Sequence, residues 1–180
     1  FDEQFLNDVA NMKEKNLAIE MLKKLLAQHI KKHQKKNLTQ AELFSEMLDK
    51  RLAEYLRGMI SNEEVIKELL EMAKLMKQHA EEGNALGLSD EEQAFYDALT
   101  RPRAVKDFYE NNQLVAMARE ITDALRKNRT LDWRQKETAR AKMRTMIKRL
   151  LKKYHYPPEE AQNAIEVVMR QCELWADNEE

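Results

Sequence analysis

Glycine and proline are scarce in this sequence, with three residues of each among 180. Average usage would give about 21 residues of the two types together. Sandwiches, barrels and dinucleotide-binding folds need many Gly and Pro turns, so this composition argues against all of them. The scarcity favours long helices joined by few turns.

Apolar residues recur at helical spacing through nearly the whole chain. Val65, Ile66, Leu69 and Met76, for example, share one face of a helix. No segment alternates with a period of two residues for long enough to predict a strand. We therefore expect an all-α fold, an irregular multi-helix bundle of about eight or nine helices. The expected helices span residues 3–13, 16–35, 40–57, 62–82, 90–99, 103–110, 112–127, 134–154 and 158–176.

Capping residues mark several of the expected helix ends. Three pairs have the spacing of a capping box, in which each side chain binds the other residue's backbone N–H. These pairs are Thr39 with Glu42, Ser61 with Glu64, and Ser89 with Glu92. Gly58 and Gly83 lie where a left-handed C-terminal cap is expected.

Residues 1–180 are expected to form a single helical domain. Residues 83–89 are the weakest internal point, and two interpretations of them stay open. They form either a hinge between subdomains or a tight loop in which Leu86 and Leu88 pack into the core. The chain begins at Phe1 rather than Met, so we expect it to be a piece of a longer polypeptide.

The sequence favours a monomeric protein of the cytoplasm. No apolar run approaches the roughly 18 residues that a membrane span needs, and no signal peptide opens the chain. The single cysteine, Cys172, excludes a disulfide framework, and its apolar neighbours Met169 and Trp175 favour a buried thiol over a nucleophile.

No motif for catalysis or cofactor binding stands out. The glycines are scattered, so there is no phosphate-binding loop. His29 and His33 have the spacing of metal ligands, but the neighbouring lysines would repel a cation, so a solvated helix face is expected there. We expect no catalytic residue, no metal ligand and no cofactor-binding residue in these 180 residues.

Positive charge is concentrated in two segments. Residues 126–153 carry twelve Lys and Arg against two acidic residues, and residues 22–36 carry six Lys and no acid. The net charge of the whole chain is nevertheless -1, so the remainder is strongly acidic.

Five of these basic residues form a single row at i,i+4 spacing, which runs as a slanted ridge along a helix. The row consists of Lys136, Arg140, Arg144, Lys148 and Lys152. Because like charges at this spacing repel, the row is expected to have an acidic partner. The partner is either an acidic segment of the same chain (62–72, 90–92 or 159–173), a nucleic-acid backbone, or an acidic face of another protein. Trp133, Tyr154 and Tyr156 flank the row and are expected to fill the core at the helix ends.

Several segments, in order along nearly the whole chain, are similar to one known family. They include residues 16–26, 44–46, 64–69, 86–89, 94–99, 132–133, 140–144 and 147–158. In these segments the chain resembles the C-terminal helical domain of the restriction (R) subunit of type I restriction–modification enzymes. One departure is His155, where the family pattern Lys-Tyr-Gly-Tyr-Pro-Pro has Gly, so we expect the turn to differ there.

The resemblance implies a role in assembly. The full R subunit is an ATP-dependent DNA translocase and endonuclease, whose nuclease and helicase domains precede this region. ATP and Mg are expected only in that N-terminal part. The partners implied for this domain are the methyltransferase and specificity subunits, onto which it would dock the motor. The alternative is a helical domain that contacts the DNA backbone directly. In either case the five-residue row is the candidate contact surface.

Overall fold

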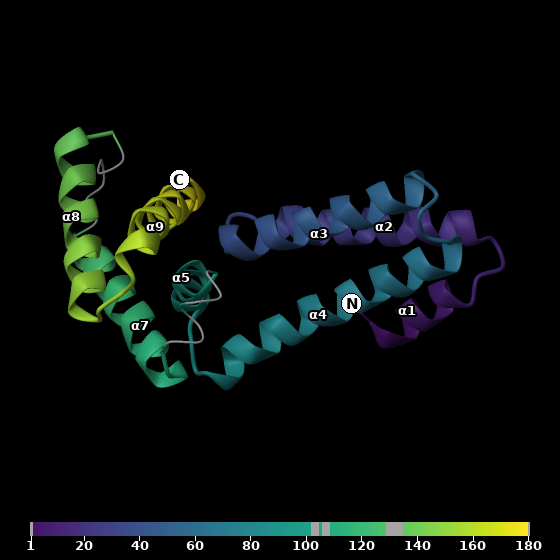
Figure 1. The fold of residues 1–180 in the computed structure, drawn as a ribbon, viewed down its shortest axis with the longest axis horizontal. Helices are drawn as coiled ribbons and strands as arrows, with labels where there is room; N and C mark the ends of the chain where they lie inside the picture. The colour runs from purple at the N-terminus through teal and green to yellow at the C-terminus, as the bar shows by residue number, and fades with distance from the viewer. Residues whose placement is uncertain (1, 102–104, 106–108, 129–134, 180) are drawn as a thin grey trace. The chain divides into compact units, whose positions relative to one another are not determined.

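The regular secondary structure of the described residues is helical. The computed structural model describes residues 2–101, 105, 109–128 and 135–179, with side chains as far as residue 175. Across these residues there is no strand, which confirms the predicted all-α fold (Figure 1). The helices are α1 (Glu3–Ala10), α2 (Lys15–His33), α3 (Leu38–Leu56), α4 (Asn62–Ala85), α5 (Asp90–Thr100), α7 (Asn111–Asn128), α8 (Glu137–Lys153) and α9 (Pro158–Glu179).

Two predictions fall on residues outside this description. The helix expected over residues 103–110 lies mostly there, and so does Trp133. Within the described residues, no helix is both long enough and apolar enough to cross a lipid bilayer.

The chain clusters into two compact units. The first unit comprises residues 1–34 and 40–85, and the second comprises residues 35–39 and 86–180. The division between Ala85 and Leu86 falls within residues 83–89. Leu88 is buried in the core of the second unit and Leu86 packs against that core, as expected for a loop that plugs it. A hinge at residues 83–89, and the assignment of the chain to a single domain, stay predictions.

The first unit is built from α1, α2, α3 and α4 around one apolar core (Figure 1). Leu22 and Leu26 of α2 and Leu69 and Met72 of α4 are fully enclosed there. Each follows the helical period of its own segment, which places the apolar stripes of α2 and α4 against each other. The Nε of Arg51 on α3 also lies 3.2 Å from a carboxylate oxygen of Glu68 on α4.

Gly58 ends α3, as predicted. Its φ is 74°, the left-handed region that glycine enters without steric cost. The Gly58 N–H donates to the Tyr55 carbonyl at 3.0 Å, and the Met59 N–H donates to the Glu54 carbonyl at 2.9 Å. These two bonds form a Schellman motif.

The prediction that Gly83 caps the C-terminus of a helix was wrong. Gly83 lies inside α4 and is buried, and the helix continues to Ala85. The left-handed residue is instead Gly87, with a φ of 70°. Glycine marks a helix end only where the chain turns, and here the turn comes four residues later.

The second unit packs α5, α7, α8 and α9 around a separate core. Phe95 of α5, Met117 and Ile121 of α7, and Met143 and Ile147 of α8 are among its largest enclosed side chains. The rings of Phe95 and Trp175 meet edge to face, with centroids 4.9 Å apart. The capping box predicted at Ser89 and Glu92 opens α5, with both of its hydrogen bonds formed. At Ser61, the Oγ accepts the Glu64 N–H at 3.2 Å.

Residues 35–39, which join α2 to α3, are held in the second unit by α9. The buried Gln171 side chain accepts the Leu38 N–H at 2.6 Å and donates its Nε2 to the Lys35 carbonyl at 2.9 Å. Asn37 donates to a carboxylate oxygen of Asp97 at 2.6 Å, and the Trp175 indole donates to the Lys36 carbonyl at 3.4 Å.

This arrangement corrects the capping box predicted at Thr39 and Glu42. The helix begins at Leu38, one residue before the expected cap. Gln171, distant in sequence, supplies the acceptor that a helix N-terminus needs. Thr39 is therefore inside the helix, buried and with its hydroxyl unbonded.

His155 ends α8 in a left-handed conformation, with a φ of 57°. The Tyr156 N–H donates to the Leu151 carbonyl at 2.9 Å, and the His155 N–H donates to the Lys152 carbonyl at 3.1 Å. This is the Schellman motif that glycine usually forms. Our expectation that the turn differs because of the histidine was therefore wrong, and His155 adopts the strained φ instead.

Three tyrosines hold this turn in place. The Tyr156 hydroxyl donates to the Leu99 carbonyl at 2.8 Å, and the Tyr109 hydroxyl donates to the Tyr154 carbonyl at 2.6 Å. The Tyr154 hydroxyl donates to Glu120 on α7. Burial raises the pKa of Tyr156 and of Tyr109. Tyr156 is buried and Tyr154 partly buried, as predicted for aromatics that fill the core at a helix end.

The rings of His29 and His33 on α2 lie in contact, tilted by 49°, with centroids 4.3 Å apart. Both are half-buried rather than fully solvated, which corrects the expected solvated face. Burial of the His29 imidazole, assisted by the charges of His33 and Lys32, lowers the pKa of His29 from 6.5 to about 4. A lowered pKa means that the folded protein binds this proton less readily than the unfolded chain does.

Replacing His155 by glycine should stabilise the protein. Left-handed φ costs an L-residue roughly 1–2 kcal/mol, partly offset by the greater freedom of glycine in the unfolded chain. We expect H155G to raise the free energy of unfolding by about 1 kcal/mol, seen as a melting temperature roughly 2–4 °C higher. The control, Lys152→Gly, removes an exposed residue within the last turn of the same helix and should destabilise by about 1 kcal/mol. If H155G is no more stable than wild type, that result would contradict the strain at this residue.

Removing the Gln171 amide should destabilise the protein. In Gln171→Leu the buried Leu38 N–H loses its acceptor, at a cost of about 1–3 kcal/mol in urea unfolding. Gln162→Leu changes an exposed glutamine of the same helix and should stay within about 0.5 kcal/mol of wild type. Equal stabilities of the two variants would show that the Gln171 bonds contribute nothing.

Acidification should destabilise the protein through His29. The unfolded histidine takes up its proton near pH 6.5, but the folded one does so only near pH 4. Protons therefore favour the unfolded chain as the pH falls through this window. We expect the urea concentration at the midpoint of unfolding to decrease as the pH is lowered from 7 to 5. In His29→Gln this decrease should be smaller. An unchanged pH dependence in H29Q would contradict the lowered pKa.

Candidate functional site

The predicted basic row lies on α8, the most basic helix of the second unit. Met143, Ile147 and Leu151, at successive i,i+4 positions, form the buried face of this helix. Lys136 is its N-cap, so the row runs from the residue just before the helix to its last turn. Each i,i+4 step advances about 40° around a helix, so such a row winds from one face to another.

The middle of the row pairs with α9. The Nη1 of Arg140 lies 2.5 Å from a carboxylate oxygen of Glu173, and the Nε of Arg144 lies 3.5 Å from Glu166. The Arg144 Nε is buried and makes no hydrogen bond, so this contact is an ion pair only. An acidic segment of the same chain, residues 159–173, is thus the partner of these two arginines, which is one of the three partners that the sequence left open.

The end of the row faces solvent. Lys148 and Lys152 are exposed, and so are two basic residues beside them, Lys142 and Arg149. We call these four residues the basic strip. Among the residues that the structure describes, none of the four has an ion-pair partner. That the five-residue row contacts a partner molecule stays a prediction.

Two members of the strip, Lys142 and Arg149, lie outside the predicted row because they do not share its i,i+4 spacing. The buried positions Met143, Ile147 and Leu151 define the opposite, exposed face, and Lys142 and Arg149 lie on it with Lys152. Thr138, Ala141 and Thr145 are the neutral residues of the same face. This face carries no apolar side chain larger than alanine.

Two other basic residues of the segment 126–153 also have acidic partners. Arg126 contacts Glu91 through its Nη2 at 2.6 Å. Lys153 donates to Glu120 at 2.7 Å, beside the Tyr154 hydroxyl. These two hydrogen bonds hold the pKa of Glu120 below its usual value, and the bond to Glu120 with burial raises the pKa of Tyr154 to about 12. Glu120 thereby neutralises a charge at the end of α8, and Glu91 neutralises one on α7.

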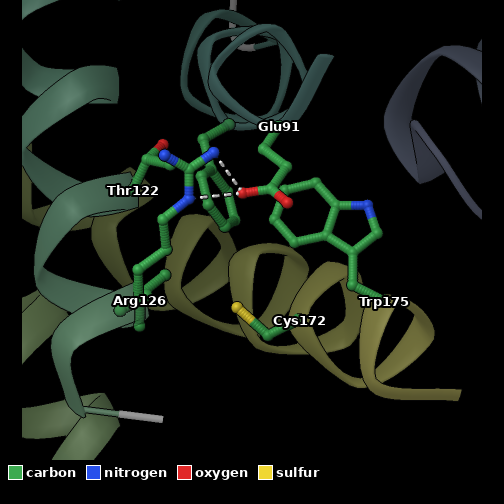
Figure 2. Close-up of a pocket in the computed structure, with 7 residues that line it drawn as sticks. Glu91, Thr122, Arg126, Cys172 and Trp175 are labelled. Carbon is green, nitrogen blue, oxygen red and sulfur yellow. Dashed lines mark hydrogen bonds and ion pairs between the residues drawn. The ribbon is translucent and has the colours of Figure 1, made fainter. Parts of the chain in front are cut away.

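A small pocket lies between α5, α7 and α9 (Figure 2). Figure 2 shows the Arg126 guanidinium and the Glu91 carboxylate meeting over it, with Thr122, Cys172 and Trp175 along its walls. Its enclosed volume is about 10 Å³, about the room that one water molecule needs. Cys172 is buried, as predicted. The pocket has no space for a substrate.

No group of three His, Cys, Asp or Glu side chains suitable for a metal occurs among the described residues. The pair His29 and His33 therefore has no third ligand within that part of the chain. The six lysines of residues 22–36 are all exposed.

Exposed apolar side chains gather in the first unit. Within the described part of the chain, all large apolar residues of high exposure belong to residues 5–75. The two most exposed flank Gly58: Leu56 is 82% exposed and Met59 is 68% exposed. We call Leu56 and Met59 the apolar turn. The Tyr55 hydroxyl lies 3.4 Å from the Asn16 Oδ1, which brings the start of α2, with the half-exposed Leu17, close to this turn.

Comparison with known proteins identifies the family. A family model described as type I restriction enzyme HindI endonuclease subunit-like, C-terminal, matches residues 1–178. The chain is 36% identical over 176 residues to the type I restriction enzyme HindI endonuclease subunit of Haemophilus influenzae, covering 98% of this chain and 17% of that protein. It is 31% identical over 152 residues to the putative type I restriction enzyme MjaIXP endonuclease subunit of Methanocaldococcus jannaschii, covering 84% of this chain and 14% of that protein. No solved structure matches the chain. The chain spans less than a fifth of either relative, and it belongs to the C-terminal family of type I restriction endonuclease subunits.

Proposed function

We propose that this domain is a non-catalytic docking module, which attaches a type I restriction endonuclease subunit to the methyltransferase and specificity subunits of the same enzyme. Family membership supports the general setting, because the relatives are named as subunits of an endonuclease. ATP and Mg then act in other parts of the parent polypeptide.

The apolar turn is the observation that carries this proposal. A leucine or methionine exposed to this degree loses the hydrophobic free energy of burial, about 1.5–3 kcal/mol for each side chain. Isolated exposed apolar residues are common, but Leu56 and Met59 adjoin each other around a rigid Schellman turn. A fixed pair of apolar side chains can enter a pocket of a partner without a large loss of conformational entropy.

The helical scaffold explains how such a turn would work. The Gly58 motif fixes the direction of Leu56 and Met59 relative to α3, and the core around Leu22 and Leu69 fixes α3 relative to α2 and α4. Burial of the two side chains against an apolar pocket then supplies affinity. Exposed charges around them supply orientation during association.

Co-purification tests the docking role. The tagged chain should retain the methyltransferase and specificity subunits, and it should do so without DNA. Because central apolar contacts each contribute more than about 1–2 kcal/mol, L56D/M59D should weaken binding by roughly 100-fold or more. Leu75→Asp, a half-exposed leucine of α4, serves as the control and should bind as wild type does.

Two results would overturn the proposal. One is a wild-type chain that retains neither subunit. The other is ATP or DNA hydrolysis by the pure 180-residue chain, which would show a catalytic function.

A further inference from the structure

We propose that the basic strip of α8 binds the phosphate backbone of duplex DNA. This inference goes beyond the docking role, because it concerns the second unit and a different class of partner. It rests on Lys142, Lys148, Arg149 and Lys152, which are exposed and lack ion-pair partners among the described residues.

The charge of the strip is not neutralised, because the acids that pair with other basic residues of α8 approach other sides of the helix. Arg140 and Arg144 reach Glu173 and Glu166 on α9, and Lys153 reaches Glu120 on α7. Lys142, Arg149 and Lys152 lie on the side of α8 opposite the buried Met143 and Ile147, and Lys148 lies at the edge of that side. The one acid of the helix, Glu137, is a full turn or more away along the helix. Four like charges therefore share one face, at a repulsive cost that an anionic partner would remove.

The chemistry of this face favours nucleic acid over an acidic protein. Centres of protein interfaces are enriched in aromatic residues and methionine and depleted in lysine. The α8 face shows the reverse, because it consists of Lys, Arg, Thr and Ala without a large apolar anchor. Lys, Arg and Thr are among the side chains that contact phosphate oxygens in protein–DNA complexes.

The dimensions of the strip favour a duplex over a single strand. Residues 142 and 152 are about 15 Å apart along the helix axis at 1.5 Å per residue. Duplex DNA carries one charge for each ~1.7 Å of its axis, so several phosphates lie within reach of four cations on this length. Proteins that bind single strands also stack the bases on aromatic rings, and the exposed face of α8 has none.

The net charge of -1 does not oppose this contact. Exposed charges act over about 8 Å at physiological ionic strength, so a phosphate at the strip responds to the strip and to few other charges. Three acids of α5 and α9, Glu91, Glu166 and Glu173, are already paired with Arg126, Arg144 and Arg140.

Salt-dependent binding provides the test. Fluorescence anisotropy would follow a labelled 25-base-pair duplex of arbitrary sequence as the 180-residue chain is added. Four phosphate contacts predict that log K falls with log salt with a slope of about -3.6, so affinity drops roughly 100-fold between 50 and 200 mM. Each single change of a strip residue to glutamine should make this slope less negative by about 0.9.

A matched pair of quadruple variants separates the strip from general charge. The strip variant changes Lys142, Lys148, Arg149 and Lys152 to glutamine, and the control changes Lys23, Lys24, Lys31 and Lys32 of the other basic segment. Both remove four positive charges from exposed positions. The strip variant should lose at least tenfold in affinity at 50 mM salt and most of the slope, whereas the control should keep both. Circular dichroism melting curves should show both variants folded.

The possible outcomes decide the proposal without depending on the docking role. Absence of duplex binding by the wild-type chain at 50 mM salt would overturn it, and so would equal losses in the two quadruple variants or tighter binding to a single strand. The strip variant retains Leu56 and Met59, so it should still co-purify with the methyltransferase and specificity subunits. A defect in one assay therefore leaves the other interpretable.

Discussion

Burial of one face of α8 is the constraint on which the surface chemistry of the second unit depends. This helix carries seven basic residues and one acid between Glu137 and Lys153. Repulsion between neighbouring cations costs about 0.2–0.5 kcal/mol for each pair, whereas burying Met143, Ile147 or Leu151 contributes about 1.5–3 kcal/mol for each side chain. Apolar packing therefore dominates, and it fixes which cations face α9 and which face solvent.

The ion pairs to α9 select a register rather than supply much stability. Arg140 and Glu173 are each about a third exposed, and partly solvated pairs of this kind contribute about 1 kcal/mol or less. Arg144 lies one turn after Arg140 on α8, whereas its partner Glu166 lies two turns before Glu173, the partner of Arg140, on α9. This opposite progression matches an antiparallel pair of helices. A slip of α9 by one turn would misplace both carboxylates.

Local signals in the sequence predicted most local features of the fold, and the error at Thr39 arose where a distant residue intervened. Apolar periodicity and the Ser89 box predicted their helices because each depends on residues within a turn or two. The Thr39 box failed because Gln171 caps α3 across 133 positions of sequence, which no local pattern can show. Likewise, the charge row was visible in the sequence, but which of its members pair with Glu166 and Glu173 depends on how α9 packs.

The attachment of residues 35–39 has a consequence for how the protein can be divided. The chain passes from one unit to the other at residues 34/35, 39/40 and 85/86, so neither unit is a single continuous segment. A polypeptide cut after Ala85 would carry the Lys35 and Leu38 backbone groups without the Gln171 amide that binds them. The complementary piece would expose the surface of α9 that this short segment covers. The two units are thus interleaved in the sequence through residues 35–39, and truncation at the apparent boundary would damage both halves at once.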